Sequence, residues 1–324
     1  MKLDFNHTSG MSCFRTNAVL RHEEWISYDQ AIIQAARTRL VGVRDLVTRG
    51  LKHTIPNGMG STVMQYEDVG ELTPAERSMD GLTRGQNDRP EFGIKYLPLP
   101  LTHYDYQIND RVLQASRDTG QSLDTTTAGL AGRQIAESLE TMLFNGTSQY
   151  KYGPSSSIIY GYTDFPNRVQ YTMAKDWALS TTTGEEIVQD VLDMKQAAID
   201  VKRYGPFVLY VPTRYETRLD GDFKSNSGIT IRQRIMEISN IEAITVVDVL
   251  EAGATSGDVN NLLLVQMTAD TVRWVNGLPI TNREMHNDEF GLVHRFKIMT
   301  IQVPQIRADQ YNSCGIVHAT FTVA

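Results

Sequence analysis

The sequence predicts an α+β fold, and three observations support this prediction. Apolar residues recur at helical spacing along 128–142, which indicates a half-buried helix. The runs FVLYV (207–211) and NLLLVQM (261–267) are short and apolar, as buried strands are. Residues 53–106 are punctuated by glycine and proline between two extended pieces, which indicates a long hairpin. With 324 residues, 41% of them hydrophobic, the chain can build two medium domains or one elaborated domain.

The N-terminal region is predicted to be an extended arm followed by a helix. Residues 1–20 show no periodicity, whereas Ser27 and Gln30 have the spacing of a capping box and Gly50 closes the pattern. The apolar face of this helix is expected to be buried and consists of Ile33, Ala36, Leu40, Val43 and Val47. The other face is basic and is expected to be solvated or to face a partner: Arg37, Arg39, Arg44 and Arg49.

The predicted hairpin has two extended legs, STVMQYEDV (61–69) and FGIKYLPLPLTHYDYQI (92–108). Between them lies a tip of mixed charge, formed by Glu71, Glu76, Arg77, Asp80, Arg84, Asp88 and Arg89. Because an isolated hairpin is marginal in water, either this arm is a mobile loop or it packs on another molecule. The tip charges are therefore candidates for contacts between subunits, where opposite charges set register and partner choice. Simple solubility is the alternative.

A long helix is predicted to follow the hairpin, with Ser122 or Asp124 as its cap and Asn145-Gly146 at its end. It would span about six or seven turns. One face carries the apolar residues Ala128, Ala131, Ile135, Leu139 and Met142. No cluster of catalytic residue types lies near this helix in the sequence, so its apolar stripe is expected to serve packing.

The second half of the chain mixes helices and strands. Residues 147–182 are predicted to form a loop with short strands, and Thr183 with Glu186 forms a capping box. The helix that follows is expected to bury Ile187, Val191, Met194, Ala198 and Val201. Short helices are predicted at 213–219 and 229–238, and strands at 207–211, 242–250, 261–267 and 271–275, followed by the strand-dominated segments 279–285, 290–307 and 315–323.

Charge and cysteine content exclude several classes of function. A formal net charge of -7 argues against a strong phosphate-binding surface, so nucleic acid is not expected to be gripped tightly. No apolar run approaches the roughly 20 residues that a spanning helix needs, and the first residues lack a signal-peptide pattern. A location inside the cell is therefore expected. Cys13 and Cys314 are expected to be free thiols.

Two short motifs resemble phosphate-binding loops without matching them. Residues 58–63 begin like G-x-G-x-x-G, but Val63 stands where the third glycine belongs, and no strand-to-helix crossover surrounds them. Residues 221–225 contain Lys224 and Ser225 without the glycine that precedes the lysine of a P-loop. Neither motif is expected to bind a nucleotide.

No catalytic or metal site emerges from the remaining residue types. The best metal candidate is His286, Asp288, Glu289 and His294, but Asn287-Asp288 is typical of a hairpin turn that would splay these side chains apart. His318 is expected to be a half-buried strand residue, and Ser313-Cys314 lacks a nucleophile elbow. The protein is therefore not expected to be an enzyme or to need a metal or cofactor.

The order of elements is more specific than any motif. LPLPLTHYDYQINDRVLQASRDTGQSLD (97–124) leads into the helix that ends ESLETMLFNG, and PFVLYVPTRYETRL (206–219) and DEFGLVHRFKIMTIQVPQ (288–305) follow. In this order the chain resembles the encapsulins and the tailed-bacteriophage major capsid proteins of the Hong Kong 97-type fold, over most of its length. The resemblance implies that the long helix is the spine of a shell subunit and that its role is rigidity.

By this resemblance the chain divides into four parts. These are an N-terminal arm and helix (1–52), an extended hairpin loop (53–106), a peripheral domain with the spine helix (107–183 and 269–303) and an axial α/β domain (184–268 and 304–324). The long hairpin tip and the polar insertion at 150–168 favour a phage capsid protein over an encapsulin, which is usually shorter.

The resemblance implies a structural subunit that self-assembles through hexamers and pentamers into an icosahedral head enclosing double-stranded DNA, without sequence-specific DNA binding and without a membrane. Portal, scaffolding or decoration proteins are further partners of this class. The location would be the virion capsid, assembled in the host cytoplasm. The first alternative is an encapsulin-like shell that encloses a cargo enzyme, and the second is an intracellular α/β enzyme.

Overall fold

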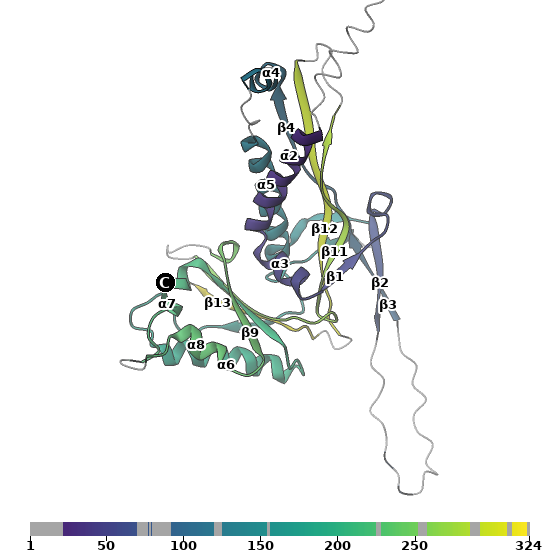
Figure 1. The fold of residues 1–324 in the computed structure, drawn as a ribbon. Coiled ribbons are helices and arrows are strands. Elements are labelled where there is room, and N and C mark those ends of the chain that lie inside the picture. Colours follow the sequence, from purple (N-terminus) through teal and green to yellow (C-terminus); the bar gives the residue numbers. More distant parts are fainter. Residues whose placement is uncertain are drawn as a thin grey trace, which may run out of the picture.

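A computed structural model describes residues 22–69, 77, 79, 92–119, 125–153, 156–224, 228–251, 258–285, 292–309 and 313–322. The described chain forms two packed bodies and a hairpin that projects from them (Figure 1). The spine body is built on a four-stranded sheet, and the axial body on a five-stranded sheet. The prediction of a mixed α+β fold is confirmed.

The sheet of the spine body has the order β1-β11-β12-β4. Its strands are β1 (Lys52–Thr54), β11 (Val272–Glu284), β12 (Val293–Ile306) and β4 (Thr102–Asn109). β12 pairs antiparallel with both β11 and β4, while β1 pairs parallel with β11. The predicted strands at 271–275 and 279–285 are thus one long strand, with register shifts around Leu278.

The predicted long helix is α5, Thr126–Asn145, and it lies against this sheet (Figure 1). All five residues of the predicted apolar stripe are buried, so that prediction is confirmed. The helix is shorter than predicted, because its 20 residues make about five and a half turns. Its N-cap is Thr125, which makes no side-chain capping bond, so neither Ser122 nor Asp124 occupies the cap position.

The predicted helix from Ser27 to Gly50 was wrong in its start and in its continuity. It is two helices, α2 (His22–Arg39) and α3 (Val41–Thr48), separated at Leu40, whose ψ of 79° is not helical. Ser27 lies inside α2 and cannot cap it. The break changes the direction in which side chains point, and the predicted face is therefore only partly buried.

On α2 the buried stripe is Tyr28, Ile32 and Ala36, while Ile33 is 40% exposed. On α3 the buried residues are Gly42, Val43 and Leu46, and Val47 is 44% exposed. Ala36 and Val43 were predicted correctly, whereas Ile33 and Val47 were not. α2 packs closely on α5, since a Cβ at Gly132 would lie only 2.9 Å from the carbonyl oxygen of Ile32.

The axial body holds a mixed sheet in the order β7-β13-β10-β8-β9. The strands are β7 (Val169–Thr172), β13 (Ile316–Thr322), β10 (Val259–Gln266), β8 (Phe207–Pro212) and β9 (Ile241–Val247). The strands predicted at 207–211, 242–250 and 261–267 are confirmed, except that the 3₁₀ turn η4 (Asp248–Leu250) replaces the end of the second. β7 belongs to this sheet although the predicted boundaries group 107–183 with the spine; those boundaries stay a prediction.

One face of this sheet is covered by α6 (Gly184–Asp200) and α8 (Ile231–Met236). The capping box of Thr183 and Glu186 is confirmed, and so are the buried Ile187, Val191, Met194 and Ala198. Val201, the fifth predicted residue, is the C-cap and is only half-buried, because the helix ends before it. The predicted helix at 213–219 is a 3₁₀ turn, η3 (Thr213–Tyr215), continued by α7 (Glu216–Leu219).

The projecting hairpin consists of β2 (Val63–Val69) and β3 (Phe92–Pro98), paired antiparallel from Val63↔Pro98 to Val69↔Phe92. The second predicted leg, 92–108, was wrong as a single strand. It ends at Pro98, and the chain then enters β4 of the spine sheet. α4 (Asp110–Thr119), which follows β4, was not predicted. A small hairpin of β5 (Thr147–Tyr152) and β6 (Ser157–Ile159) follows α5.

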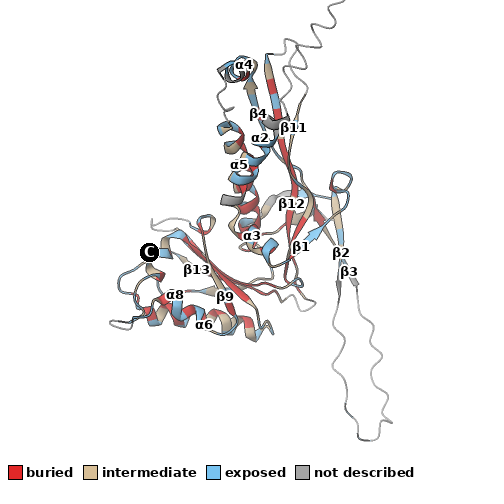
Figure 2. Cartoon of the chain, in the orientation of Figure 1, coloured by how far each residue is buried: buried red, intermediate tan, exposed pale blue. Residues whose placement is uncertain are grey.

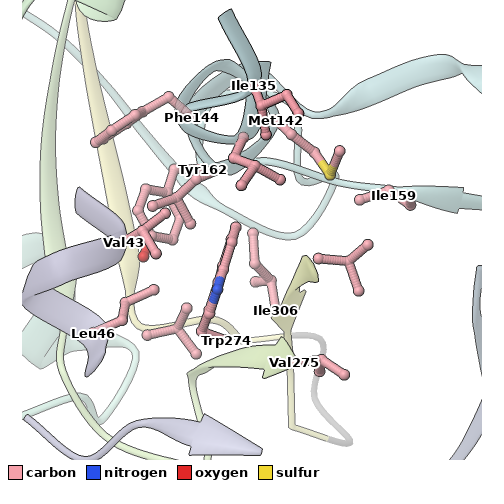
Figure 3. Packing of buried hydrophobic residues seen from close by; sticks show 14 of the residues in the cluster. Val43, Leu46, Ile135, Met142, Phe144, Ile159, Tyr162, Trp274, Val275 and Ile306 are labelled. Atoms are coloured by element: carbon pink, nitrogen blue, oxygen red, sulfur yellow. The ribbon is translucent and has the colours of Figure 1, made fainter. Parts of the chain in front are cut away.

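The core has two parts that share the five-stranded sheet (Figure 2). Along β8, Val208 and Tyr210 face the cluster that contains the spine helix, while Leu209 and Val211 face the α6 side. This alternation is the period of two expected of a strand buried on both faces. Figure 3 shows Phe144 of α5 and Tyr162 together with Val43 of α3, where the two bodies meet. The bodies therefore share one continuous apolar contact.

Candidate assembly interface

The β2–β3 hairpin projects from the rest of the described chain (Figure 1, Figure 2). It forms a two-stranded sheet that joins neither larger sheet. Ile94 is 54% exposed, whereas Leu97 and Leu99, at the root, are buried. A two-stranded sheet with open faces is marginal alone. The hairpin is therefore an arm that is buried at its root and has exposed side chains further along its strands.

The root of the arm is fixed by backbone contact. The 3₁₀ turn η1 (Gly58–Gly60) packs on Gly277 of β11 so tightly that a Cβ at Gly58 would collide with the Gly277 backbone. The Ile55 N–H donates to the Asn276 carbonyl at 2.9 Å. The glycines at 58 and 60 therefore serve close packing, and they lead into a strand instead of the helix that a nucleotide loop requires.

A groove of about 520 Å³ lies at the root of the arm. Its walls come from β2, β3, β6, the loop after β6 and the end of β12, and include Tyr66, Tyr96, Phe165 and Pro304. Arg307, just beyond β12, donates from Nη2 to the Glu67 carbonyl at 3.0 Å. The arm is thus anchored to the spine body at two separate points.

Six of the seven tip charges lie outside the described residues: Glu71, Glu76, Asp80, Arg84, Asp88 and Arg89. Arg77 is described, and it is exposed. Their role in contacts between subunits stays a prediction.

A second structural feature is the junction between the two bodies, which α3 bridges. Asp45 of α3 accepts hydrogen bonds from the Tyr210 hydroxyl of β8 and the Thr245 hydroxyl of β9, each at 3.2 Å. Arg49, just after α3, forms an ion pair with Glu242 of β9. Arg49 was predicted to be solvated or to face a partner, and it faces this chain instead. Arg44 is exposed, and the side chains of Arg37 and Arg39 lie outside the described residues.

Glu140 of the spine helix holds the other side of α3 and was missed at the sequence level. It is 2% exposed, and its carboxylate accepts from Gly42 N at 2.6 Å and from Val43 N at 3.5 Å. The available signal was its position one turn after Ala136, beside the apolar stripe. Burial raises the pKa of Glu140 to about 7, although the backbone N–H groups oppose this shift.

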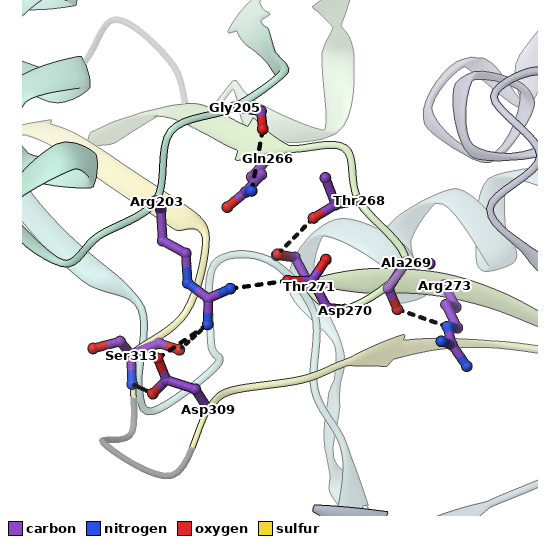
Figure 4. Close-up of polar contacts among 10 residues, drawn as sticks. All are labelled: Arg203, Gly205, Gln266, Thr268, Ala269, Asp270, Thr271, Arg273, Asp309 and Ser313. Atoms are coloured by element: carbon purple, nitrogen blue, oxygen red, sulfur yellow. Dashed lines mark hydrogen bonds and ion pairs between the residues drawn. The ribbon is translucent and has the colours of Figure 1, made fainter. Parts of the chain in front are cut away.

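The connections from one sheet to the other are held together by Arg203 (Figure 4). Its guanidinium bonds Asp270 at 3.1 Å in the connection from β10 to β11, and Asp309 at 3.2 Å in the connection from β12 to β13. It also donates to the Ser313 carbonyl at 3.1 Å. One half-buried arginine therefore joins two connections between the bodies.

The metal candidate does not form a site in the described chain. His286, Asp288 and Glu289 lie outside the described residues. His294 is buried in β12, with Nε2 3.2 Å from Asp110 Oδ1 and Nδ1 3.6 Å from Glu284 Oε1. In the part of the chain that the structure describes, no group of three or more His, Cys, Asp or Glu is suited to hold a metal ion.

The other candidate residues have structural partners. Cys314 is a buried free thiol, and burial raises its pKa to about 12, so it is a poor nucleophile. His318 was predicted to be half-buried and is buried in β13, where it accepts from Arg168 at 2.9 Å. Lys224 forms an ion pair with Glu185, and Ser225 lies outside the described residues. None of the described helices is long and apolar enough to cross a membrane.

Solved structures with this arrangement are shells. The chain is similar to the virus-like particle from Pyrococcus furiosus, with a TM-score of 0.63 and 16% identity over 93% of this chain and 100% of that chain. It is similar to the capsid of Myoviridae phage XM1, with a TM-score of 0.64 and 10% identity over 85% of this chain and 90% of that one. For Mycobacterium phage Bobi the TM-score is 0.58 at 14% identity, over 85% of this chain and 90% of that chain.

A curated relative agrees with this fold over part of the chain. The type 1 encapsulin shell protein EncA of Myxococcus xanthus (strain DK1622) is 27% identical over 135 residues, which are 41% of this chain and 44% of that protein. The alignment thus spans less than half of the relative. Together these findings define a protein of the Hong Kong 97-type capsid fold. The chain belongs to a family of unknown function, DUF6260, whose sequence model matches residues 15–319.

Proposed function

We propose that this chain is a major capsid protein, the structural subunit of an icosahedral head that encloses the double-stranded DNA of a tailed bacteriophage. The observation that carries the proposal is a capsid fold over nearly the whole chain combined with an arm that stands away from its own body. A head-to-tail contact that lays this arm on a neighbour generates a closed ring when the rotation closes. Rings of six and five then make a shell.

The role proposed is structural, with no catalytic step assigned to any residue. Its support is that the relatives are shell and capsid proteins and that the buried polar groups described above have structural partners. The net charge of -7 suits a wall that encloses DNA without gripping it. Assembly in the host cytoplasm, and contacts with portal, scaffolding or decoration proteins, belong to this same proposal.

The second candidate is an encapsulin-like shell that holds a cargo enzyme. It is favoured by the likeness to EncA and to the Pyrococcus furiosus particle. Electron microscopy and nuclease treatment of particles purified from the native source separate the two proposals. Shells filled with double-stranded DNA support the phage head, and shells with protein cargo support the compartment. A chain that forms no shell contradicts both.

The charged tip of the arm is proposed to dock on a neighbouring subunit. Exposed ion pairs contribute only about 0 to 1 kcal/mol each, so a solvated loop gains little from alternating charges, whereas an interface gains register and specificity. Reversing Arg77, Arg84 and Arg89 together to Glu is expected to leave the subunit folded and to reduce the yield of closed shells. The reduction is expected to be most severe at low salt, because like charges are least screened there.

Circular dichroism for folding and sedimentation for assembly, across a salt series, measure this effect. The matched control reverses Lys224, Arg232 and Arg234 to Glu on the axial body, which changes the net charge equally but breaks only exposed pairs within the chain. Normal shells from the tip variant at every salt concentration would contradict docking of the tip and would indicate that its charges serve solubility alone. Equal loss in both variants would assign the effect to net charge.

A further inference from the structure

Glu140 of α5 has a buried carboxylate that lies against the first amides of α3, where it takes the place of an N-cap side chain. The first N–H groups of a helix have no acceptor within the helix, and Leu40 at the cap position supplies none. Glu140 reaches them from another helix, and its contacts with Gly42 N (2.6 Å) and Val43 N (3.5 Å) join the spine helix to α3. Packing reinforces the join, since a Cβ at Gly42 would lie 2.9 Å from the Phe144 ring.

The opposite side of α3 is fastened to the axial body. Asp45 accepts from the hydroxyls of Tyr210 and Thr245, and Arg49 forms an ion pair with Glu242. α3 is therefore the connecting piece between the two bodies, with Glu140 on its spine side and three strand residues on its axial side. A change at Glu140 alters one of the two attachments and leaves the other in place.

The surroundings of Glu140 disfavour its negative charge. The titratable groups that face it are Asp248 of η4, Tyr162 of the loop after β6, and Tyr210 of β8, and Asp45 of α3 faces the same two tyrosines. Within the described residues no lysine, arginine or histidine forms an ion pair with it. The Tyr162 hydroxyl is buried beside this acidic group with no hydrogen-bond partner in the described structure. A carboxylate buried among acidic and phenolic groups binds a proton more tightly than one in water.

We propose that Glu140 is a proton-responsive link between the spine helix and α3, and that release of its proton loosens the hold of the spine on the axial body. Its pKa in the closed junction is about 7, raised from the ordinary 4.5 that it regains when water reaches it. The proton thus stabilises the closed junction fully below pH 4.5, and this contribution is lost as pH rises through 7. The link is a property of the single chain and does not depend on the proposed shell.

The test compares the full-length wild-type chain with Glu140→Gln between pH 5.5 and 8.5. Glutamine keeps the shape and an acceptor oxygen for Gly42 N but cannot titrate. Hydrogen exchange at the amides of 41–47 and 241–247, corrected for intrinsic rates, is expected to rise about thirtyfold in the wild type. The reason is that about 1.5 pKa units of differential proton binding lie between pH 5.5 and the pKa of about 7, and each unit is a factor of ten. In Glu140→Gln it is expected to stay constant across this range.

Glu137→Gln is the matched control, because Glu137 lies on the same helix but is partly exposed and pairs with Arg133 at 2.8 Å. It is expected to retain the pH dependence of the wild type. A parallel rise in Glu140→Gln would overturn the proposal. Sedimentation at each pH reports the assembly state, so a failure to form shells is recorded separately.

A second measurement needs no variant. Infrared spectroscopy of the wild-type chain follows the band of the buried protonated carboxyl as pH rises, and its disappearance near pH 7 is expected. Complete loss of any buried carboxyl band below about pH 5.5 would show that Glu140 titrates as an ordinary glutamate, and it would overturn the proposal even if Glu140→Gln failed to fold.

Discussion

The five-stranded sheet is mixed and the β2–β3 hairpin is antiparallel, and the two are stabilised in opposite ways. β8 is buried at all six positions, with α6 and α8 over one face and the spine helix over the other. The hairpin has neither cover, and Ile94 in β3 is 54% exposed. The difference separates the region that the chain stabilises by its own packing from the region that we propose docks on a neighbour. It also implies that substitutions in the two regions affect different measurements.

The largest effect is expected from Leu139→Ala in the spine helix, on the self-supported side of this comparison. Leu139 is fully buried in the cluster to which both bodies contribute, so truncation leaves a cavity and is expected to cost about 2 to 5 kcal/mol of subunit stability. Leu130→Ala, at a site 57% exposed on the same helix, is the control and is expected to cost less than about 0.5 kcal/mol. Equal melting curves for the two variants would contradict the assignment of the buried face.

A pH effect of up to about 3 kcal/mol is expected from His318 in the five-stranded sheet. Burial, together with the Arg168 guanidinium, lowers the pKa of His318 to about 4 from 6.5. The neutral ring therefore contributes stability fully above pH 6.5, and this contribution is lost as pH falls through 4. His318→Gln removes the titration, so its melting temperature is expected to fall less than that of the wild type between pH 6.5 and 4. Parallel curves would exclude this histidine as the cause.

The next largest change in stability is expected at the root of the arm. It tests whether the root is stabilised by packing within the chain. Gly58→Ala forces a methyl group into the Gly277 backbone and is expected to cost about 1 to 3 kcal/mol. Gly129→Ala is the matched control: it lies in α5 with open space around its Cβ, and it is expected to gain about 0.5 to 1 kcal/mol. Thermal unfolding measures both. A Gly58→Ala variant that is as stable as the wild type would show that the contact at Gly58 can relax.

The smallest effect on stability is expected in the hairpin itself. Ile94→Ser is expected to change subunit stability by less than about 0.5 kcal/mol while reducing assembly, because its side chain meets mostly solvent in the single chain. Hydrogen exchange of 63–69 and 92–98 is expected to be faster than that of β8 before assembly and to slow on assembly. Strong and equal protection of both regions in a verified monomer would remove the distinction between them.

Elements with local signals were predictable from the sequence. The stripe of α5 follows the 3.6 period through five buried positions, and the Thr183–Glu186 capping box marks the start of α6. The end of β3 also had a signal, because Pro98 and Pro100 cannot donate to a ladder, yet the leg was predicted to continue. α4 has few apolar residues: Leu113 is buried, whereas Val112 is 56% exposed, so the helix has no broad apolar stripe in its sequence.

The break between α2 and α3 could not be predicted from local sequence, because the residue at the break is Leu40, and leucine is a good helix former. Its determinants are distant in the chain: the Phe144 ring against Gly42, and the Glu140 carboxylate on the α3 amides. The same holds for the junction, where Asp45 meets residues 165 and 200 positions away. Residue types were visible in the sequence, but their convergence depends on tertiary packing.

The bonds that Arg203 makes to two connecting segments also affect how the subunit carries mechanical load. β10 and β13 are neighbouring antiparallel strands, and the ends that lead to the spine body lie at the same edge of the sheet, where Val265 faces Ile316. A force that pulls on the spine body therefore acts on β10 and β13 together. Arg203 bonds both connecting segments, because it pairs with Asp270 after β10 and with Asp309 before β13. β8 pairs with β10 and β7 pairs with β13, so the force acts along the strands at both pairs. The hydrogen bonds between these paired strands are therefore loaded together in shear and not broken one at a time.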